Sequence, residues 1–213
     1  MKHFISKITR PFYRWLLRVI TPIDSWERLP HRLAAARFGS PQEFDWYLRG
    51  ESAVPVASVD EIVAWLVDCE YASDQSLFGK RDHWQHPTTF ERLRRGDCED
   101  HALWAWRKLR ELGIDADFVV GRQLYDDAEI PATKGAHAWV LFRREGQEFL
   151  LEAVATSASR MIRPLSAVAA QYRPEYGIGS DMKTFAFAGM AETHYETEFR
   201  TRRKRSDPDA RTG

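Results

Sequence analysis

Apolar and polar positions follow a helical period in the stretch "SVDEIVAWLVDCEYA", which begins at Ser58. Ser58 is a favourable N-cap, and Glu61 three positions later completes a capping-box pattern. Four residues share one face of the predicted helix: Ile62, Trp65, Leu66 and Cys69. The pattern therefore predicts a helix that starts after Ser58 and places Cys69 in the core as a small apolar side chain.

A second helical pattern runs from Cys98 to about Leu112, within and beyond the motif "RRGDCEDHALWAW". Its apolar stripe consists of Ala102, Ala105, Trp106, Leu109 and Leu112. Asp97 is a suitable N-cap, and Gly113 fits the position after the last helical turn. We therefore expect a helix that begins at the cysteine and packs this stripe on the core.

Patterns typical of β-strands follow this helix. Four segments show them: "ADFVVGR", "AHAWVLFR", "QEFLLEAVA" and "MKTFAFAG". The residues "REGQ" join the second segment to the third as a β-hairpin. The intervening stretch "RPLSAVAAQYRPEYGIGS" has no clear period, and we expect it to be irregular. Helices followed by neighbouring strands predict an α+β fold.

Residues 1–20 combine helical spacing of apolar residues with Lys and Arg and no acidic residue. Two interpretations stay open: a helical arm packed on the domain, or a basic amphipathic helix on an anionic membrane. Residues 21–57 contain Pro22, Pro30, Pro41 and Pro55, which favour broken helices and turns. We predict a helical N-terminal arm and irregular lead-in over 1–57, the main domain over 58–198, and a disordered basic tail over 199–213.

The composition suits a folded domain with a sizeable core, because 44% of the 213 residues are hydrophobic and eight are tryptophan. Lys and Arg balance Asp and Glu at 31 each, so net charge indicates no particular partner. The basic tail lacks interleaved aromatic residues, and no nucleic-acid partner is expected. Two cysteines are too few for a disulfide framework, and there is no convincing export signal. We therefore expect a cytoplasmic location, with membrane contact through residues 1–20 as the open alternative.

Three residues have the types that nucleophilic catalysis needs: Cys98, His137 and Glu152. Cys98 lies at a predicted helix N-terminus, where unpaired N–H groups favour a thiolate and can stabilise an oxyanion. If Glu145 and Gly146 form a two-residue turn, Trp139 pairs with Glu152, and His137 becomes a diagonal neighbour of Glu152 on the same face. A one-residue bulge would change that register.

Two other interpretations of this region remain. Cys98 and His101 are spaced i, i+3 and would supply two zinc ligands, with His137 and Glu152 completing the set. Alternatively, His101 is an ordinary polar helix residue and Cys98 is an inert buried thiol. Asp97 and Glu99 are unfavourable neighbours for a thiolate, so these acids either hydrogen-bond the backbone or hold a cation.

The blocks "WQHPTTFERLRRGDCEDHA", "GAHAWVLF" and "FLLEAVA" resemble the motif blocks of bacterial transglutaminase-like cysteine proteins. The resemblance covers about residues 80–155 and extends toward 190. It implies a papain-like transglutaminase core, in which a nucleophile-bearing helix packs on a small antiparallel sheet.

The resemblance also implies roles for individual residues. Cys98 would be the nucleophile, His137 the base and Glu152 the orienting acid, in a position where many relatives have Asp. Gln85 matches the position that supports an oxyanion hole, and Trp84 is the other candidate.

The implied function is thiol-dependent acyl transfer on amide bonds, above all by a cysteine peptidase acting on a protein or peptide substrate. Transglutaminase or amidase activity is an alternative, as is a catalytically silent binding domain. One branch of the superfamily binds calcium through acids beside its cysteine, and Asp97 and Glu99 match those positions. Calcium is therefore the candidate metal, and we expect no other cofactor.

Overall fold

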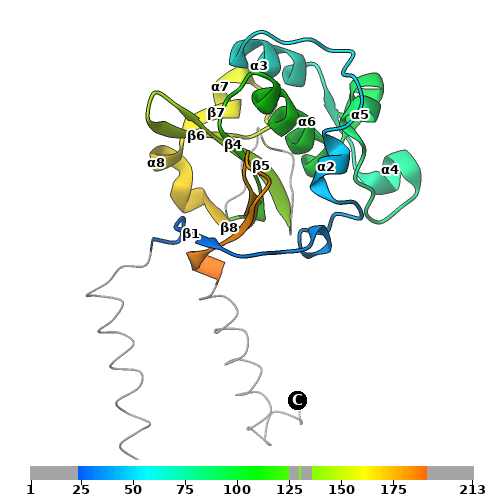
Figure 1. Ribbon diagram of the computed structural model, residues 1–213. Coiled ribbons are helices and arrows are strands. Elements are labelled where there is room, and N and C mark those ends of the chain that lie inside the picture. The colour runs from blue at the N-terminus through cyan, green and yellow to red at the C-terminus, as the bar shows by residue number, and fades with distance from the viewer. Residues whose placement is uncertain (1–23, 125–129, 131–135, 191–213) are drawn as a thin grey trace, which may run out of the picture. The chain divides into compact units, whose positions relative to one another are not determined.

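The computed structural model describes residues 24–124, 130 and 136–190 (Figure 1). Residues 29–186 form one compact unit, which is described here by itself. The predictions for residues 1–20 and for the tail over 199–213 lie outside the described residues, and the domain boundaries stay predictions. Within the described ranges, no helix is long and apolar enough to cross a membrane.

A seven-stranded sheet organises the fold and confirms the α+β class. Strand β4 pairs antiparallel with β5 and β8, and the pairs β5–β6, β6–β7 and β8–β9 are also antiparallel. The strands follow the order β1 (Arg28–Pro30), β9 (Thr184–Phe187), β8 (Tyr172–Ile178), β4 (Ala116–Gln123), β5 (His137–Arg144), β6 (Gln147–Leu151) and β7 (Ile162–Pro164). The sheet is therefore larger than the small sheet that the sequence predicted.

Strand β8 lies in the segment that we expected to be irregular. Its burial alternates from Tyr172 to Tyr176 in the way that a strand requires, but Pro174 and Gly177 obscure this period in the sequence. The register between β4 and β8 shifts where Gly121 pairs with Pro174. This irregularity lets the sheet accept a proline in an interior strand.

The helices are mostly short, and most precede β4 in the chain. They are α2 (Phe44–Tyr47), α3 (Val59–Val67), α4 (Asp74–Phe78), α5 (Pro87–Leu93), α6 (Cys98–Glu111), α7 (Ala158–Met161) and α8 (Leu165–Val168), with 3-10 turns at Ala35–Arg37 and Ala169–Gln171. A small parallel sheet joins β2 (Glu70–Tyr71) to β3 (Arg95–Gly96). Helix α6 packs against β4 and β5, while α3 and α5 also contact it (Figure 1).

The predicted start of α3 and end of α6 agree with the structure, but α3 ends at Val67, so Cys69 lies beyond the helix and is half-buried instead of being in the core. Ser58 accepts a hydrogen bond from the Glu61 backbone N–H, so it caps α3 as expected. Gly113 follows α6 with a φ of 73°, a backbone conformation that favours glycine. The apolar stripe of α6 is buried as predicted up to Leu109, but Leu103 and Trp104 are buried as well. Because α3 and α5 contact α6 in addition to the sheet, its burial extends beyond one stripe.

The β5–β6 hairpin has the register that the sequence predicted. Glu145 and Gly146 form the turn, with φ angles of 53° and 76°. Arg144 pairs with Gln147, and the pairing continues without a bulge to Val140 and Leu151.

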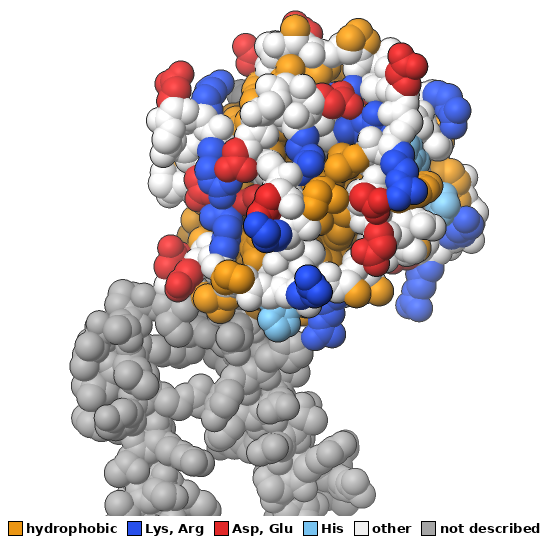
Figure 2. Space-filling model, in the orientation of Figure 1, with side chains coloured by type: hydrophobic (Ala, Val, Ile, Leu, Met, Phe, Trp, Pro, Cys, Tyr) orange, Lys and Arg blue, Asp and Glu red, His pale blue; other side chains and the backbone are white. Residues whose placement is uncertain are grey.

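Figure 2 shows Lys and Arg side chains interspersed with Asp and Glu over the face in view, in keeping with the balanced charge of the chain.

Candidate active site

Cys98 is the first residue of α6, as the sequence predicted. The residue is only 7% exposed, and the backbone N–H of Ala138 lies close enough to the sulfur to lower the pKa of the thiol, although burial and the neighbouring acids outweigh it. Because Ala138 follows His137 in β5, this contact brings the thiol to the strand that carries the histidine. The first N–H groups of α6 have no carbonyl acceptor within the helix, so they make the surroundings of the sulfur partly positive.

His137 and Glu152 are buried and in direct contact. His137 Nε2 lies 3.0 Å from Glu152 Oε1 and 2.9 Å from Oε2. A carboxylate accepts, so the imidazole donates from Nε2, which fixes the tautomer when the ring is neutral. His137 Nδ1 is buried and has no hydrogen-bond partner among the described residues. The nitrogen that Glu152 leaves open is therefore the one that can accept a proton.

Glu152 occupies the first position after β6, where the chain leaves the sheet. Its backbone N–H donates to the Met161 carbonyl at 2.7 Å instead of continuing the ladder with β5. Its side chain is fully buried. The side chains of His137 and Glu152 meet as predicted, although Glu152 lies one residue beyond the last pair of the hairpin and is not paired with Trp139.

Two residues that the sequence analysis missed support Glu152. The Tyr172 hydroxyl donates to Glu152 Oε2 at 2.8 Å, and Arg163 Nη2 donates to the Tyr172 oxygen at 3.1 Å. Tyr172 begins β8 and Arg163 lies in β7, so both belong to the segment that we expected to be irregular. In the sequence, Tyr172, Pro174 and Tyr176 alternate with Arg173 and Glu175, and this period of two was the signal that would have placed Tyr172 on the inner side.

Gln85 lies close to the start of α6, but its amide is engaged elsewhere. Its Nε2 donates to the Arg95 carbonyl at 2.9 Å and also to Asp100, while its backbone N–H donates to Asp100 Oδ1 at 2.7 Å. A Cβ at Gly96 would lie 2.7 Å from this Nε2, so the glycine makes room for it. Both amide hydrogens bind within the protein, and an oxyanion role for Gln85 stays a prediction. Trp84 packs edge-on against Phe118 in the core.

The acids beside Cys98 do not all turn away from it, in contrast to one of our two expectations. The Cys98 thiol donates to Glu99 Oε2 at 3.2 Å. Asp97 occupies the N-cap position of α6 but makes no side-chain capping bond, so the expected cap is absent. Asp100 does accept from a backbone N–H, that of Gln85.

Burial and mutual repulsion raise the pKa values of these groups. Burial raises the pKa of Asp97 to about 6, and burial together with the charge of Asp97 raises the pKa values of Glu99 and Asp100 well above their usual range. The pKa of the Cys98 thiol is also raised well above its ordinary value, first by burial and then by the charges of Glu99 and Asp97. In this state the cysteine is a protonated thiol that donates to Glu99.

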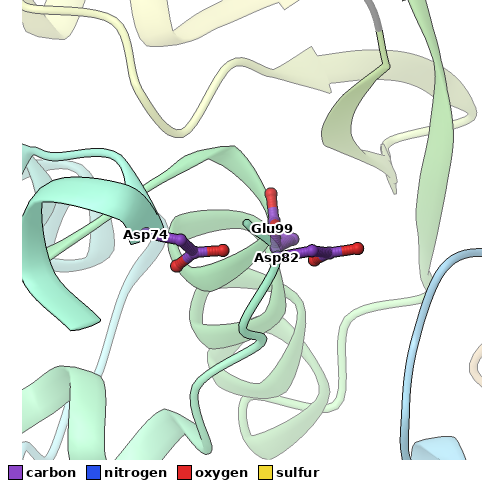
Figure 3. A group of neighbouring side chains, drawn as sticks. All are labelled: Asp74, Asp82 and Glu99. Atoms are coloured by element: carbon purple, nitrogen blue, oxygen red, sulfur yellow. The ribbon is translucent and has the colours of Figure 1, made fainter. Parts of the chain in front are cut away.

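Two groups of carboxylates near Cys98 have the spacing of metal ligands. One consists of Asp74, Asp82 and Glu99, which come from α4, the segment after it and the start of α6 (Figure 3). The other consists of Asp74, Asp97 and Asp100, and in each group the ligand atoms lie within 4.8 Å of one another. These are the metal-ligating groups found among the described residues, and neither contains Cys98 or a histidine. The alternative of a zinc site at Cys98 and His101 is therefore not supported.

His101 is a buried core residue, where one of our expectations was an ordinary polar helix residue. It is 2% exposed, its Nδ1 donates to the Asp97 carbonyl at 2.8 Å, and its ring contacts Phe90. Burial lowers the pKa of His101 to about 4, so the ring is neutral at physiological pH. Because Phe90 belongs to α5, which packs on α6, tertiary contacts explain the burial of a histidine beside the predicted stripe.

Comparison with known proteins identifies the family of this fold. Residues 46–151 match the sequence model of the transglutaminase-like superfamily, so the chain contains a transglutaminase-like superfamily domain. The match includes Cys98 and His137 and ends one residue before Glu152. No curated protein matches the chain.

Solved structures similar to this chain include Legionella pneumophila LapG. It is 17% identical, with a TM-score of 0.46 over 75% of this chain and 90% of that chain. A calcium-bound form of the Legionella protein has the same identity and TM-score over 73% of this chain and 88% of its own. The family is established by the sequence match, whereas the chemistry of the site rests on the contacts described above.

Proposed function

We propose that the chain is a thiol-dependent acyl-transfer enzyme that acts on amide bonds, and that its principal reaction is peptide hydrolysis. Cys98 is the nucleophile, His137 the general base and Glu152 the acid that orients the base. The observation that carries the proposal is the contact of Glu152 with His137 Nε2. It leaves the buried Nδ1 open on a histidine whose neighbouring residue, Ala138, touches the Cys98 sulfur.

The reaction begins with transfer of the Cys98 proton to His137 Nδ1. The thiolate then attacks the substrate carbonyl carbon, a C–S bond forms, and the carbonyl oxygen takes the electron pair. When the C–N bond breaks, the imidazolium returns its proton to the leaving amine. Water, deprotonated by His137, releases the acyl group as a carboxylic acid and restores the thiol. A primary amine in place of water would complete a transamidation.

Backbone N–H groups at the start of α6 would stabilise the oxyanion. The backbone N–H of Cys98 is among the first of this helix, which have no carbonyl acceptor within it, and such groups stabilise negative charge. We propose that Gln85 supports this site from its position against Asp100 and Arg95. In that role its side-chain amide would have to exchange one of these internal acceptors for the oxyanion.

The carboxylates beside the thiol fit a calcium ion. Calcium takes oxygen ligands from Asp and Glu, and both carboxylate groups supply only oxygen. Asp74 Oδ1 and Asp97 Oδ1 are buried and have no hydrogen-bond partner among the described residues, so they have free capacity as ligands. We propose that Asp74, Asp82 and Glu99 hold calcium, with Asp97 and Asp100 adjoining them.

When bound, calcium would supply positive charge next to carboxylates whose repulsion now opposes a thiolate. Glu99 and Asp97 are the charged groups that raise the pKa of Cys98, after burial itself. Neutralising them would favour the ionised sulfur that the reaction needs. The proposed metal thus has an electrostatic role, and Cys98 and His137 retain the chemical steps.

A catalytically silent binding domain is the second candidate. The observation that favours it is the buried Cys98 thiol, which donates to Glu99 and has a raised pKa. Such a domain would keep the cysteine protonated whether or not calcium is present. Reactivity of the thiol in excess calcium separates the two candidates.

Incubation with a panel of unfolded proteins tests the enzymatic proposal. In excess calcium, mass spectrometry of labelled N-termini should detect new termini with the wild-type chain and none with Cys98→Ser. Added hydroxylamine should divert part of the acyl groups to hydroxamates, which measures how readily the acyl-enzyme accepts an amine. Cleavage that persists in Cys98→Ser would contradict the proposal, because it would place the activity outside this thiol.

A further inference from the structure

From Glu152, polar side chains continue as a hydrogen-bonded series through Tyr172 and Arg163 to Gln171. Tyr172 is 3% exposed and bonds Glu152, and Arg163 bonds Tyr172 in turn. The guanidinium of Arg163 also donates to Gln171 Oε1 at 3.3 Å. The proposed catalytic roles use none of these three residues, although the series ends on the carboxylate that contacts His137.

The direction of each hydrogen bond follows from the chemistry of the partners. A guanidinium can only donate, so the Tyr172 oxygen accepts from Arg163. The single hydroxyl proton of Tyr172 is then free to point at Glu152 Oε2, which accepts. Burial and the charge of Glu152 raise the pKa of Tyr172, which keeps this proton in place.

The Tyr172 bond restrains a carboxylate that would otherwise have rotational freedom. Both oxygens of Glu152 lie at similar distances from His137 Nε2, so the contact with the histidine alone does not select one orientation. The hydroxyl binds Oε2 only. The Tyr172 ring also lies nearly parallel to the His137 ring, at 22° and 6.4 Å, and contacts Trp139 at 5.1 Å. Tyr172 therefore meets both members of the His137–Glu152 pair.

We propose that Tyr172 is a positioning residue that fixes the Glu152 carboxylate against His137 Nε2, and that Arg163 orients its hydroxyl. This inference rests on the proposed function, since it assigns Tyr172 a part in preparing His137 as a base. A hydroxyl donor on Oε2 stabilises the ionised carboxylate, and an ionised carboxylate holds the proton of His137 on Nε2. Nδ1 then stays unprotonated and ready for the thiol.

A purely structural role is the competing explanation, because Tyr172 is also a buried residue of β8 whose ring packs near His137 and Trp139 of β5. The two explanations differ in what happens to His137. Loss of packing alone would lower stability but leave the tautomer of His137 unchanged. Loss of positioning would change the tautomer and the reactivity of Cys98 even where the fold is intact.

The test compares Tyr172→Phe with Tyr176→Phe in a Cys69→Ser background, where Cys98 is the remaining thiol. Tyr176 is a matched control, because it lies on the same strand and is buried to a similar degree. In excess calcium, we expect Tyr172→Phe to slow alkylation of Cys98 by iodoacetamide about tenfold, as loss of a hydrogen bond to a charged group allows. Tyr176→Phe should leave the rate unchanged. In ¹⁵N spectra of the His137 ring, only Tyr172→Phe should reduce the Nε2-protonated tautomer.

Arg163 supplies a second pair of variants in case Tyr172→Phe fails to fold. Arg163→Met removes the donor and should slow alkylation in the same direction, whereas Arg163→Lys keeps a donor and should restore much of the rate. Wild-type alkylation that depends on His137 but is unchanged in Tyr172→Phe or Arg163→Met, with unaltered ring spectra, would overturn this inference alone. Wild-type Cys98 that reacts no faster than free cysteine would instead overturn the proposed function.

Discussion

Glu99 accepts a hydrogen bond from the Cys98 thiol, although a carboxylate at this distance opposes ionisation of a nucleophile. Asp97 adds to the effect, and together with burial these charges raise the pKa of the thiol. The sequence places Asp97 and Glu99 next to Cys98 but does not decide which way they turn. Asp74, which lies in another segment, comes within 4.8 Å of both acids only in the folded chain.

The His137–Glu152 contact could be predicted from the sequence, because strand geometry and a two-residue turn fix a diagonal pair. The contact of Tyr172 with Glu152 could not be predicted, since it depends on the pairing of β8 with β4. Contacts within one hairpin can thus be predicted from the spacing of residues in the sequence. Contacts between β8 and the end of β6 require the complete sheet.

Cys69 provides a prediction at the scale of one residue. Its thiol donates to the Trp65 carbonyl at 3.4 Å, and burial raises its pKa to about 11. A higher pKa means less thiolate at neutral pH, so in a Cys98→Ser background we expect Cys69 to react with iodoacetamide about tenfold more slowly than free cysteine. Mass spectrometry over time measures this rate. Alkylation of Cys69 as fast as that of free cysteine would contradict the raised pKa that its half-buried position gives.

At the scale of elements, α6 is the centre of the domain. It presents Cys98 at one end and is buried along most of its length between the sheet, α3 and α5. The sequence predicted its start, its end and one apolar stripe, because these depend on local periodicity and capping. The sequence did not predict that Lys108 would be fully buried, since its burial depends on α5 and on the loop of residues 52–54.

Lys108 supplies a prediction about the stability of this element. Its ammonium donates to the Val54 carbonyl at 2.6 Å and to Glu111 at 2.9 Å, and it lies 3.5 Å from buried Glu91. Removal of one partner from a buried ion pair leaves an uncompensated charge, so we expect Lys108→Ala to lower the free energy of unfolding by about 3–5 kcal/mol.

Urea denaturation measures this change, and Lys183→Ala is the control. Lys183 pairs with Asp181 at 2.7 Å in an exposed ion pair, and exposed pairs add little to stability. Equal midpoints for Lys108→Ala and the wild-type chain would show that the Lys108 network contributes nothing to folding.

At the scale of the whole molecule, the net charge is balanced, although carboxylate side chains cluster in one place. Lys and Arg equal Asp and Glu in number, and they are interspersed over the face in Figure 2. Yet five carboxylates gather around the start of α6: Asp74, Asp82, Asp97, Glu99 and Asp100. Composition therefore indicated no ionic partner, while the fold assembles a candidate site for one.

Calcium should stabilise the folded chain if this assembly binds it. A ligand that binds only the folded state raises the free energy of unfolding, by about 2.7 kcal/mol at a concentration one hundred times its Kd. We therefore expect calcium to raise the melting temperature and a chelator to reverse the rise, as differential scanning calorimetry would record.

Asp74 is the carboxylate common to both groups, so Asp74→Asn should abolish most of the calcium response. Asp60→Asn is the control, because Asp60 is an exposed acid in the first turn of α3. A melting temperature that calcium leaves unchanged in the wild-type chain would exclude the proposed calcium site.

The central claim is that His137 activates Cys98, and the rate of Cys98 alkylation tests it most directly. In the Cys69→Ser background, with excess calcium at neutral pH, we expect iodoacetamide to react with Cys98 at least about tenfold faster than with free cysteine. His137→Ala should remove that advantage, because the base that accepts the thiol proton is gone. Alkylation no faster than that of free cysteine, and unchanged by His137→Ala, would contradict the account and leave a silent transglutaminase-like domain.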